Sequence, residues 1–196
     1  MRISERRAKK KREEILKSAI AIVNKKGYEG TTMEEIAAAL LMTKGSLYYY
    51  FKNKDDLIFQ CHNFVLSKAV KDLEKCLRAE NGVSASDTLK KMIEIHIYYA
   101  FNQKESLNLI IEPKKAYTGE YLEPVLRLRK HYAGLFDEII ERGVTQGEFV
   151  VHEPIITRQF ILGGLNWVQQ WVRPNGRLTI DDIIDLFAYN ILKILK

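Results

Sequence analysis

Hydrophobic residues recur along most of this chain at the spacing of helices rather than at the alternating spacing of strands. Prolines are few, and most glycines lie between the periodic stretches instead of inside them. The pattern therefore predicts an all-α protein of about nine helices. The expected helices cover, approximately, 4–26, 33–40, 43–50, 54–78, 87–102, 106–112, 121–146, 154–172 and 180–195.

Several of the expected helices carry capping signals at their ends. Thr32 is followed three residues later by Glu35, which is the spacing of a capping box. Asn53 and Thr179 each stand directly before another helix, where a short polar side chain can accept a backbone N–H. Gly27 follows the first periodic stretch and is expected to end it.

Residues 32–51 contain two short helices separated by about four residues, which is the arrangement of a helix-turn-helix. The second helix of such a motif can lie in the major groove of DNA while the first supports it. Leu47 and Phe51 are four residues apart, so they share one side of the second helix and can be buried together. We predict that this second helix is a recognition helix.

The other residues in and after this helix suit contact with DNA. Its first turn is small and polar, which leaves the helix N-terminus open to a phosphate. A tyrosine offers an apolar ring to thymine methyl groups and a hydroxyl to phosphate oxygens. Tyr50 is as compatible with packing as with DNA contact. The residues predicted to contact DNA are Thr43, Lys44, Gly45, Ser46, Tyr48, Tyr49, Lys52 and Lys54.

Positive charge is concentrated at the N-terminus. Residues 1–12 hold seven lysines and arginines against one acid, Glu5, so they account for the whole formal net charge of +6. A basic segment on an otherwise neutral chain suggests a polyanionic partner, because each neutralised phosphate releases counterions. A solvated tail that only aids solubility is the alternative interpretation.

Nothing in the sequence indicates an enzyme, a metal site or a cofactor. No glycine-rich phosphate loop or nucleophile elbow is present. The four histidines lie in different segments, without metal-ligand spacing to each other or to the two cysteines. Two cysteines are too few for a disulfide framework, and no apolar run is long enough to cross a bilayer. We therefore expect no catalytic residues, and a cytoplasmic protein with reduced thiols and no membrane partner.

The last two expected helices, 154–172 and 180–195, are apolar on more than one side. A helix that is apolar on two sides must bury both, and in a chain of this length the second side is expected to form a subunit interface. Gly163 and Gly164 are costly inside a helix unless a close helix contact or a ligand requires them. We predict a homodimer; a single deep core is the alternative.

The helices at 87–102 and 121–146 mix aromatic and polar residues, as does part of the helix at 154–172. Such a mixture suits a concave site for a small, largely hydrophobic effector, with a few polar groups that orient it. Ordinary core aromatics would give the same composition. The candidate effector-binding residues are His96, Tyr99, Asn102, Tyr132, Phe136, Asn166, Trp167 and Gln170.

Several residues of the segment 13–57 occur together in a known pattern: Ile15-Leu16, Gly27-Tyr28, Thr31-Thr32, Glu35-Ile36-Ala37, residues 44–51 and residues 52–57. Through these residues the segment resembles the N-terminal domain of the tetracycline-repressor (TetR) family. The resemblance implies an all-helical homodimer whose C-terminal domain binds a small effector and then releases DNA. It also implies that Thr32 and Lys54 contact phosphates. We expect a DNA-binding domain over 1–52 and an effector-binding and dimerisation domain over 53–196.

One residue departs from the family pattern. Leu41 stands in the turn of the helix-turn-helix, where the family usually has glycine. A left-handed backbone suits glycine and costs other residues about 1 kcal/mol or more. Either the turn adjusts or Leu41 accepts the strain, and the angle of the recognition helix depends on which occurs.

A stretch near the C-terminus is similar to a subset of the family; it comprises residues 163–167, Trp171, residues 173–174, Gly176 and residues 178–179. Many members of that subset regulate fatty-acid metabolism and respond to acyl-coenzyme A thioesters, which implies an acyl-CoA effector. The anionic end of such a ligand could meet Arg127, Arg129 or Lys130, although a solvated helix surface would carry the same residues.

The sequence thus predicts a ligand-responsive repressor that binds a double-stranded operator as a homodimer. A DNA-coating protein without sequence specificity is the main alternative, since the basic segment alone would serve it. A membrane-surface module anchored by the basic first helix is a third possibility, and the narrow apolar side of that helix argues against it.

Overall fold

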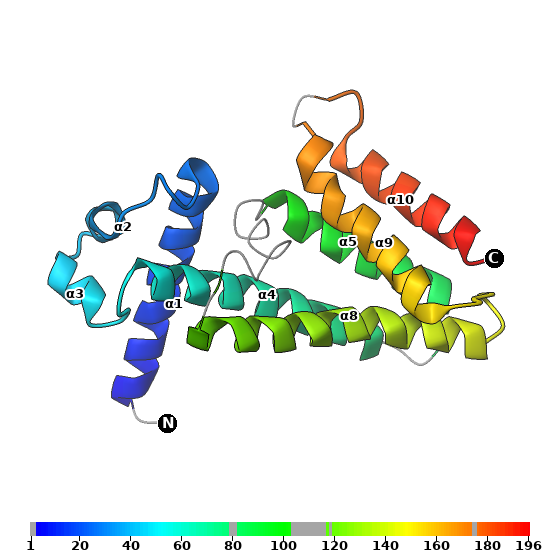
Figure 1. Cartoon of the computed structure of the whole chain (residues 1–196), viewed down its shortest axis with the longest axis horizontal. Helices are drawn as coiled ribbons and strands as arrows, with labels where there is room; N and C mark the ends of the chain where they lie inside the picture. The colour runs from blue at the N-terminus through cyan, green and yellow to red at the C-terminus, as the bar shows by residue number, and fades with distance from the viewer. Residues whose placement is uncertain (1–2, 79–81, 103–116, 118, 174–175) are drawn as a thin grey trace. The chain divides into compact units, whose positions relative to one another are not determined.

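The computed structural model describes residues 3–78, 82–102, 117, 119–173 and 176–196. Within these ranges the chain forms α-helices and one short 3₁₀ helix, η1, and contains no strand, so the all-α prediction is confirmed (Figure 1). The expected helix at 106–112 lies outside the described residues. The elements are α1 (Ile3–Lys26), α2 (Met33–Ala39), α3 (Lys44–Tyr48), α4 (Lys54–Arg78), α5 (Ala85–Asn102), η1 (Gly119–Tyr121), α8 (Leu122–Thr145), α9 (Pro154–Trp171) and α10 (Ile180–Ile194).

The chain divides into two compact units. Unit 1 comprises residues 1–66 and 103–125, and unit 2 comprises residues 67–102 and 126–196. Both α4 and α8 therefore have residues in each unit. The two units are described separately below.

Unit 1 is built on α1, with α2 packed against both α1 and α3. Leu47 and Phe51 are buried as their spacing predicts, and they lie in the core of this unit together with Ile15 and Ile36. At the far end of α1, Gly27 adopts a φ of +75° and its N–H bonds to the Val23 carbonyl, so it ends the helix as expected.

The turn between α2 and α3 keeps a left-handed residue although no glycine is present. Leu41 has a φ of +54°, and it is the only described non-glycine residue with a positive φ. The turn is held by two backbone bonds, from the Leu41 N–H to the Ala38 carbonyl and from the Met42 N–H to the Ala37 carbonyl. Leu41 thus accepts the strain, and its side chain is 97% exposed.

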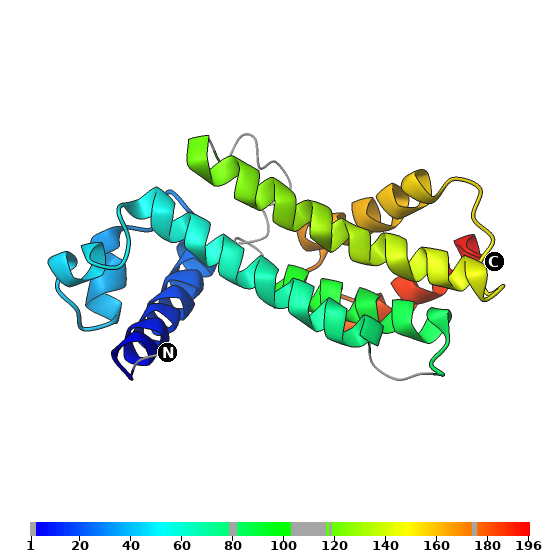
Figure 2. The ribbon, with the colours of Figure 1, turned by 90° about the horizontal axis from the view of Figure 1, so that it is seen from below.

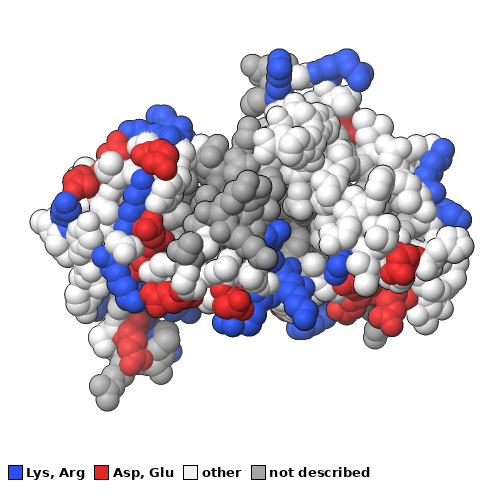
Figure 3. Space-filling model, viewed as in Figure 1, with Lys and Arg blue, Asp and Glu red and all other residues white. Residues whose placement is uncertain are grey.

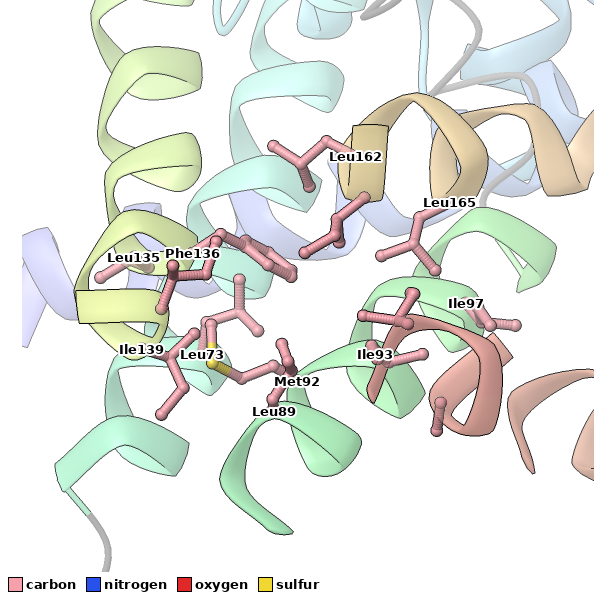
Figure 4. Packing of buried hydrophobic residues seen from close by; sticks show 14 of the residues in the cluster. Leu73, Leu89, Met92, Ile93, Ile97, Leu135, Phe136, Ile139, Leu162 and Leu165 are labelled. Carbon is pink, nitrogen blue, oxygen red and sulfur yellow. The ribbon is translucent and has the colours of Figure 1, made fainter. Parts of the chain in front are cut away.

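The core of unit 2 lies where α5 meets α9 and α10 (Figures 1 and 2). Figure 4 shows leucine and isoleucine side chains, Met92 and the Phe136 ring lying close together there. This cluster buries more large apolar residues than the rest of the described chain, and it holds the helices of unit 2 together. The labelled members are Leu73, Leu89, Met92, Ile93, Ile97, Leu135, Phe136, Ile139, Leu162 and Leu165.

Two helices of unit 2 begin at side chains that accept their first backbone N–H groups. The Glu148 carboxylate accepts the backbone N–H groups of Ala85, at 2.8 Å, and Ser86, at 2.9 Å, and the Ser84 hydroxyl accepts that of Asp87 at 3.0 Å. With these groups satisfied, α5 begins at Ala85, two residues before the start that the sequence predicts. Thr179 forms a reciprocal capping box with Asp182 at the start of α10.

Candidate DNA-binding and effector-binding sites

The recognition helix α3 is short and presents its polar side to solvent. Thr43 caps it, because the Thr43 hydroxyl accepts the backbone N–H of Ser46 at 3.1 Å. A tight last turn, with both Tyr50 and Phe51 N–H groups bonded to the Leu47 carbonyl, ends the helix at Tyr48 rather than at Tyr50 as expected. Tyr50 is half-buried.

All five predicted DNA-contacting residues of the cap and helix are exposed, from Thr43 through Tyr48. Tyr49 follows them and is 83% exposed. On the neighbouring helix α2, Thr32 is also exposed and its hydroxyl accepts the N–H of Glu35 at 3.2 Å. Thr32 therefore caps α2 as predicted, while the Glu35 carboxylate bonds to the Lys26 ammonium. The structure thus gathers small, polar and phenolic groups on one exposed surface of unit 1.

Two lysines near this surface form ion pairs that no local sequence pattern indicates. The Lys44 ammonium forms an ion pair with Glu34 of α2. Lys52 pairs with Glu120 of η1 at 3.3 Å, and Glu120 is 68 residues further along the chain. These contacts hold the lysines close to the surface of unit 1.

Lys54 is held differently, over an aromatic ring. Its ammonium lies 4.1 Å from the centre of the Tyr28 ring, a cation–π contact. The Tyr28 hydroxyl in turn donates a hydrogen bond to Asp55, and this bond raises the pKa of Tyr28 to about 12. Lys54 is therefore positioned by Tyr28, one of the residues that carry the family resemblance.

The described part of the basic N-terminal segment is helical. Residues 3–10 belong to the first turns of α1 and are exposed. Further along, the Arg12 guanidinium lies 5.0 Å from the centre of the Phe51 ring, next to the recognition helix. The cations of residues 6–12 are thus carried on α1, which contacts the residue Phe51 after the recognition helix through Arg12.

Three of the candidate effector-binding residues meet inside unit 2. His96 of α5 and Tyr132 of α8 are joined by a 2.9 Å hydrogen bond, and the Phe136 ring packs against both. The His96 ring also bonds to the backbone of Leu165 on α9. Burial lowers the pKa of His96 to about 4, so the ring is neutral at physiological pH.

The other candidates lie elsewhere in unit 2. Tyr99 donates a hydrogen bond of 2.6 Å to Asp72 of α4, and Asn102 is exposed at the end of α5, where its amide donates to the Tyr98 carbonyl. Trp167 is 60% exposed on α9. On the same helix Asn166 is half-buried and Gln170 is exposed. The structure therefore does not bring the eight candidates into one site.

One arginine of α8 differs from its charged neighbours. Arg127 and Lys130 are exposed, whereas Arg129 is half-buried and burial lowers the pKa of its guanidinium. Arg129 has no acidic partner among the described residues. It is three residues before Tyr132 and so lies on the same side of α8 as the buried pair.

Large apolar side chains are exposed along one side of α9. Phe160, Gly163, Gly164, Trp167 and Trp171 follow one another at helical spacing on this side. Figure 3 shows that the surface over α9 is largely free of lysine, arginine, aspartate and glutamate. A methyl group added at Gly163 would meet no atom within 4 Å, so packing within the described chain does not require this glycine. The exposed residues and the glycines together form what we call the α9 face.

The described ranges contain neither a metal-binding cluster nor a membrane-spanning helix. No group of three or more histidine, cysteine or carboxylate side chains there is arranged to hold a metal ion. No helix of the described chain is both long and apolar enough to span a bilayer.

Comparison with known proteins identifies the family of this chain. A family model for bacterial regulatory proteins of the tetR family matches residues 15–61, and one for the tetracyclin repressor-like C-terminal domain matches residues 82–195. The second match alone covers more than half of the chain. The chain belongs to the TetR family. Members of this family are DNA-binding transcriptional regulators rather than enzymes, which confirms both predictions.

Individual TetR proteins resemble the chain over most of its length. The HTH-type transcriptional repressor KstR2 of Rhodococcus jostii (strain RHA1) is 25% identical over 193 residues, which cover 93% of this chain and 89% of that protein. The fatty acid metabolism regulator protein of Bacillus subtilis (strain 168) is 22% identical over 162 residues, covering 81% and 82%. The crystal structure of AibR in complex with isovaleryl coenzyme A and operator DNA has a TM-score of 0.75 and 26% identity, covering 94% of this chain and 97% of that one.

Proposed function

We propose that this TetR-family protein is a ligand-responsive repressor that binds a double-stranded operator as a homodimer and is released by a hydrophobic effector. The observation that carries the proposal is the exposed polar side of α3, from Thr43 to Tyr49, opposite the buried Leu47 and Phe51. A helix anchored on one side and polar on the other suits insertion into a major groove.

We assign the DNA contacts by their positions in unit 1. Lys44 and Tyr48, on the exposed side of α3, are the candidates for reading bases. Gly45 leaves space for the backbone of the helix to approach the duplex, since no atom lies within 4 Å of the position of its missing side chain. The residues assigned to phosphates or to the edge of the groove are Thr32, Thr43, Ser46, Tyr49, Lys52 and Lys54.

The proposed dimer is formed by α9 and α10, within a C-terminal domain that we assign to residues 53–196. The α9 face supports this, because a second copy would cover the exposed Phe160, Trp167 and Trp171. Gly163 and Gly164 would then allow the two copies to approach closely, which explains why glycine is tolerated inside the helix. A two-fold dimer would present two DNA-binding domains, each over residues 1–52, to a near-palindromic operator.

We propose an acyl thioester as the effector. Two relatives support this class, since one is a fatty acid metabolism regulator and the other is seen with isovaleryl coenzyme A. The apolar core around Phe136 suits an acyl chain, and the neutral His96–Tyr132 pair offers polar groups near it. Arg129 is the favoured partner for a negative charge, because it is half-buried without an acid beside it.

Release from DNA would follow from a shift in population between two states. An effector lowers operator affinity only if it binds the DNA-incompetent state more tightly. α4 is continuous through both units, so a movement at the effector site in unit 2 can be passed along this helix to unit 1.

The test combines selection of a preferred DNA sequence with operator release. The selected site should be bound at least a thousand-fold more tightly than random DNA at physiological salt. Equal affinity for both would instead establish the non-specific DNA-coating protein. Lys54→Ala should weaken binding to both DNAs, whereas Lys44→Ala should change the preference among operator variants.

The effector is tested by adding acyl-coenzyme A compounds of increasing length to the protein–operator complex. Each buried methylene contributes about 0.8 kcal/mol, so release should need less ligand as the chain grows until the site is full. Planar aromatic cations serve as the contrast. Release by the cations without any response to acyl chains would overturn the acyl thioester and leave the repressor.

A further inference from the structure

Unit 2 contains a groove outside the buried His96–Tyr132 pair. Its lining residues come mainly from the second half of α4 and from α5, and its volume is about 560 Å³. The two helices run antiparallel (Figure 2). Two contacts form part of its lining. The Tyr99 hydroxyl donates to Asp72 at 2.6 Å, and the Cys76 thiol lies 3.8 Å from the Thr88 carbonyl. We call this the α4–α5 groove.

Three lysines line the groove without pairing. Lys68 and Lys75 come from α4 and Lys91 comes from α5. None of the three has an ion-pair partner in the described ranges. By contrast Lys90, the neighbour of Lys91 outside the groove, is paired with Asp185 at 2.9 Å.

The acids of the groove do not cancel this charge. Asp72 and Glu94 are the acidic residues of the lining, so the ammonium groups outnumber the carboxylates by one. Asp72 already accepts the Tyr99 hydroxyl. Burial raises the pKa of the Cys76 thiol, so the thiol stays neutral near neutral pH and adds no negative charge. An anion that enters therefore meets unpaired cations.

An exposed aromatic ring completes the lining. Tyr98 is 60% exposed, and its ring packs edge-on against that of Tyr99 with 5.9 Å between the centres. Tyr98 is seven residues after Lys91, so the two share one side of α5 about 10 Å apart. The open face of the Tyr98 ring is available for stacking by a planar group.

We propose that the α4–α5 groove binds a phosphorylated nucleoside, with the phosphates on Lys75 and Lys91 and the base on Tyr98. Charge and aromatic surface are needed together, because a phosphate alone leaves Tyr98 unused and an apolar ligand leaves three ammonium groups unpaired. The separation of about 10 Å along α5 matches the extended distance from a base to its second phosphate.

A coenzyme A thioester carries a phosphorylated nucleoside, so the groove would hold that part of the proposed effector. This link rests on the proposed function, whereas the groove's affinity for a nucleotide rests on its own residues.

The test measures binding by calorimetry to the full chain without DNA. The probes are coenzyme A, adenosine 3′,5′-bisphosphate and inorganic pyrophosphate. Lys75→Ala/Lys91→Ala should weaken all three by tenfold or more. The matched control, Lys71→Ala/Lys90→Ala, removes the same charge from two lysines of the same helices that do not line the groove, and should stay within twofold of the wild type. Tyr98→Ala should weaken the two adenine compounds and leave pyrophosphate unchanged.

Three results would overturn the proposal: no binding of any probe, equal losses in the two double variants, or no loss in either. Operator release is measured in parallel, so the groove and the effector are judged separately. Release by acyl-coenzyme A without affinity for the bisphosphate would refute the groove and keep the proposed effector. Bisphosphate binding that only the groove variant loses, with no release by any acyl compound, would support the groove and refute that effector.

Discussion

Lys44 of the recognition helix is bound to Glu34 of the supporting helix by an ion pair that crosses the helix-turn-helix. The pair raises the pKa of Lys44 and lowers that of Glu34. Both side chains are more than half exposed, so the pair adds little to stability. The pair matters for DNA binding, because Lys44 is proposed to contact DNA and already forms an ion pair with the Glu34 carboxylate.

Glu34→Gln should therefore strengthen operator binding. The substitution frees Lys44 and removes a negative charge that faces the phosphates, and exposed charges of this kind change affinity by roughly two- to fivefold. The measurement is operator affinity over a series of salt concentrations. Glu138→Gln makes the same change in net charge on the exposed part of α8 in unit 2 and should have a smaller effect. Equal effects of the two substitutions would show that only net charge matters.

Buried His96 should make the stability of the protein depend on pH. Its pKa falls from 6.5 to about 4 on folding, so below pH 6.5 the unfolded chain binds a proton that the folded chain excludes. The free energy of unfolding should be unaffected by this group above pH 6.5 and should decrease towards pH 4, by at most about 3 kcal/mol.

The measurement is urea denaturation between pH 7.5 and 4. His96→Gln should remove the part of the decrease that lies between pH 6.5 and 4.5, before most carboxylates titrate. His131→Gln should retain it, because His131 is exposed and paired with Glu74 on the surface of unit 2. If both variants followed the wild-type profile, His96 would not be the group that titrates.

Leu41→Gly should stabilise the protein. The left-handed backbone at Leu41 costs about 1 kcal/mol that glycine does not incur, and an exposed side chain loses little packing when it is removed. Part of this gain is lost to the greater freedom of glycine in the unfolded chain. Leu40→Gly, at a φ of −97°, should destabilise instead. Both effects are measured by chemical denaturation. A loss of stability in Leu41→Gly would show that the left-handed backbone at Leu41 is not strained.

Two glycines of α8 should respond oppositely to alanine. A Cβ at Gly143 would lie 2.1 Å from the Phe149 ring, so Gly143→Ala should destabilise by about 1–3 kcal/mol or more. A Cβ at Gly134 meets no atom within 4 Å, so Gly134→Ala should stabilise by about 0.5–1 kcal/mol. Thermal denaturation compares the two, and the same sign for both would show that Phe149 moves aside easily.

The proposed dimer should depend on the α9 face rather than on the core behind it. Phe160 is 64% exposed, so Phe160→Glu should give a folded monomer. Leu165 is fully buried one turn further on, so Leu165→Glu should unfold unit 2. Sedimentation gives the mass and circular dichroism gives the helix content. A wild-type monomer at micromolar concentration would remove the basis for the interface.

The amphipathic pattern and the motifs of residues 32–54 determined much of what was predicted. They fixed the helical class, most helix boundaries, the caps at Thr32 and Thr179, and the buried side of α3. These features depend on residues three or four apart, and such neighbours meet wherever a helix forms. The same local pattern was sufficient to indicate the TetR family.

Other features were decided only by tertiary structure, since they join residues far apart in sequence. The Glu148 carboxylate accepts the first N–H groups of α5, and the Lys52 ammonium is held by Glu120. No spacing within a helix could have indicated either partner.

The effector residues show the same limit. Composition marked eight candidates, but the way the helices of unit 2 pack joins His96 to Tyr132, turns Tyr99 towards Asp72 and leaves Trp167 exposed. The sequence indicates on which side of its own helix a residue lies. Which residues of other helices that side contacts depends on how the helices cross. The sequence by itself therefore determined what kind of protein this is, and the tertiary structure decided which of its polar groups lie together.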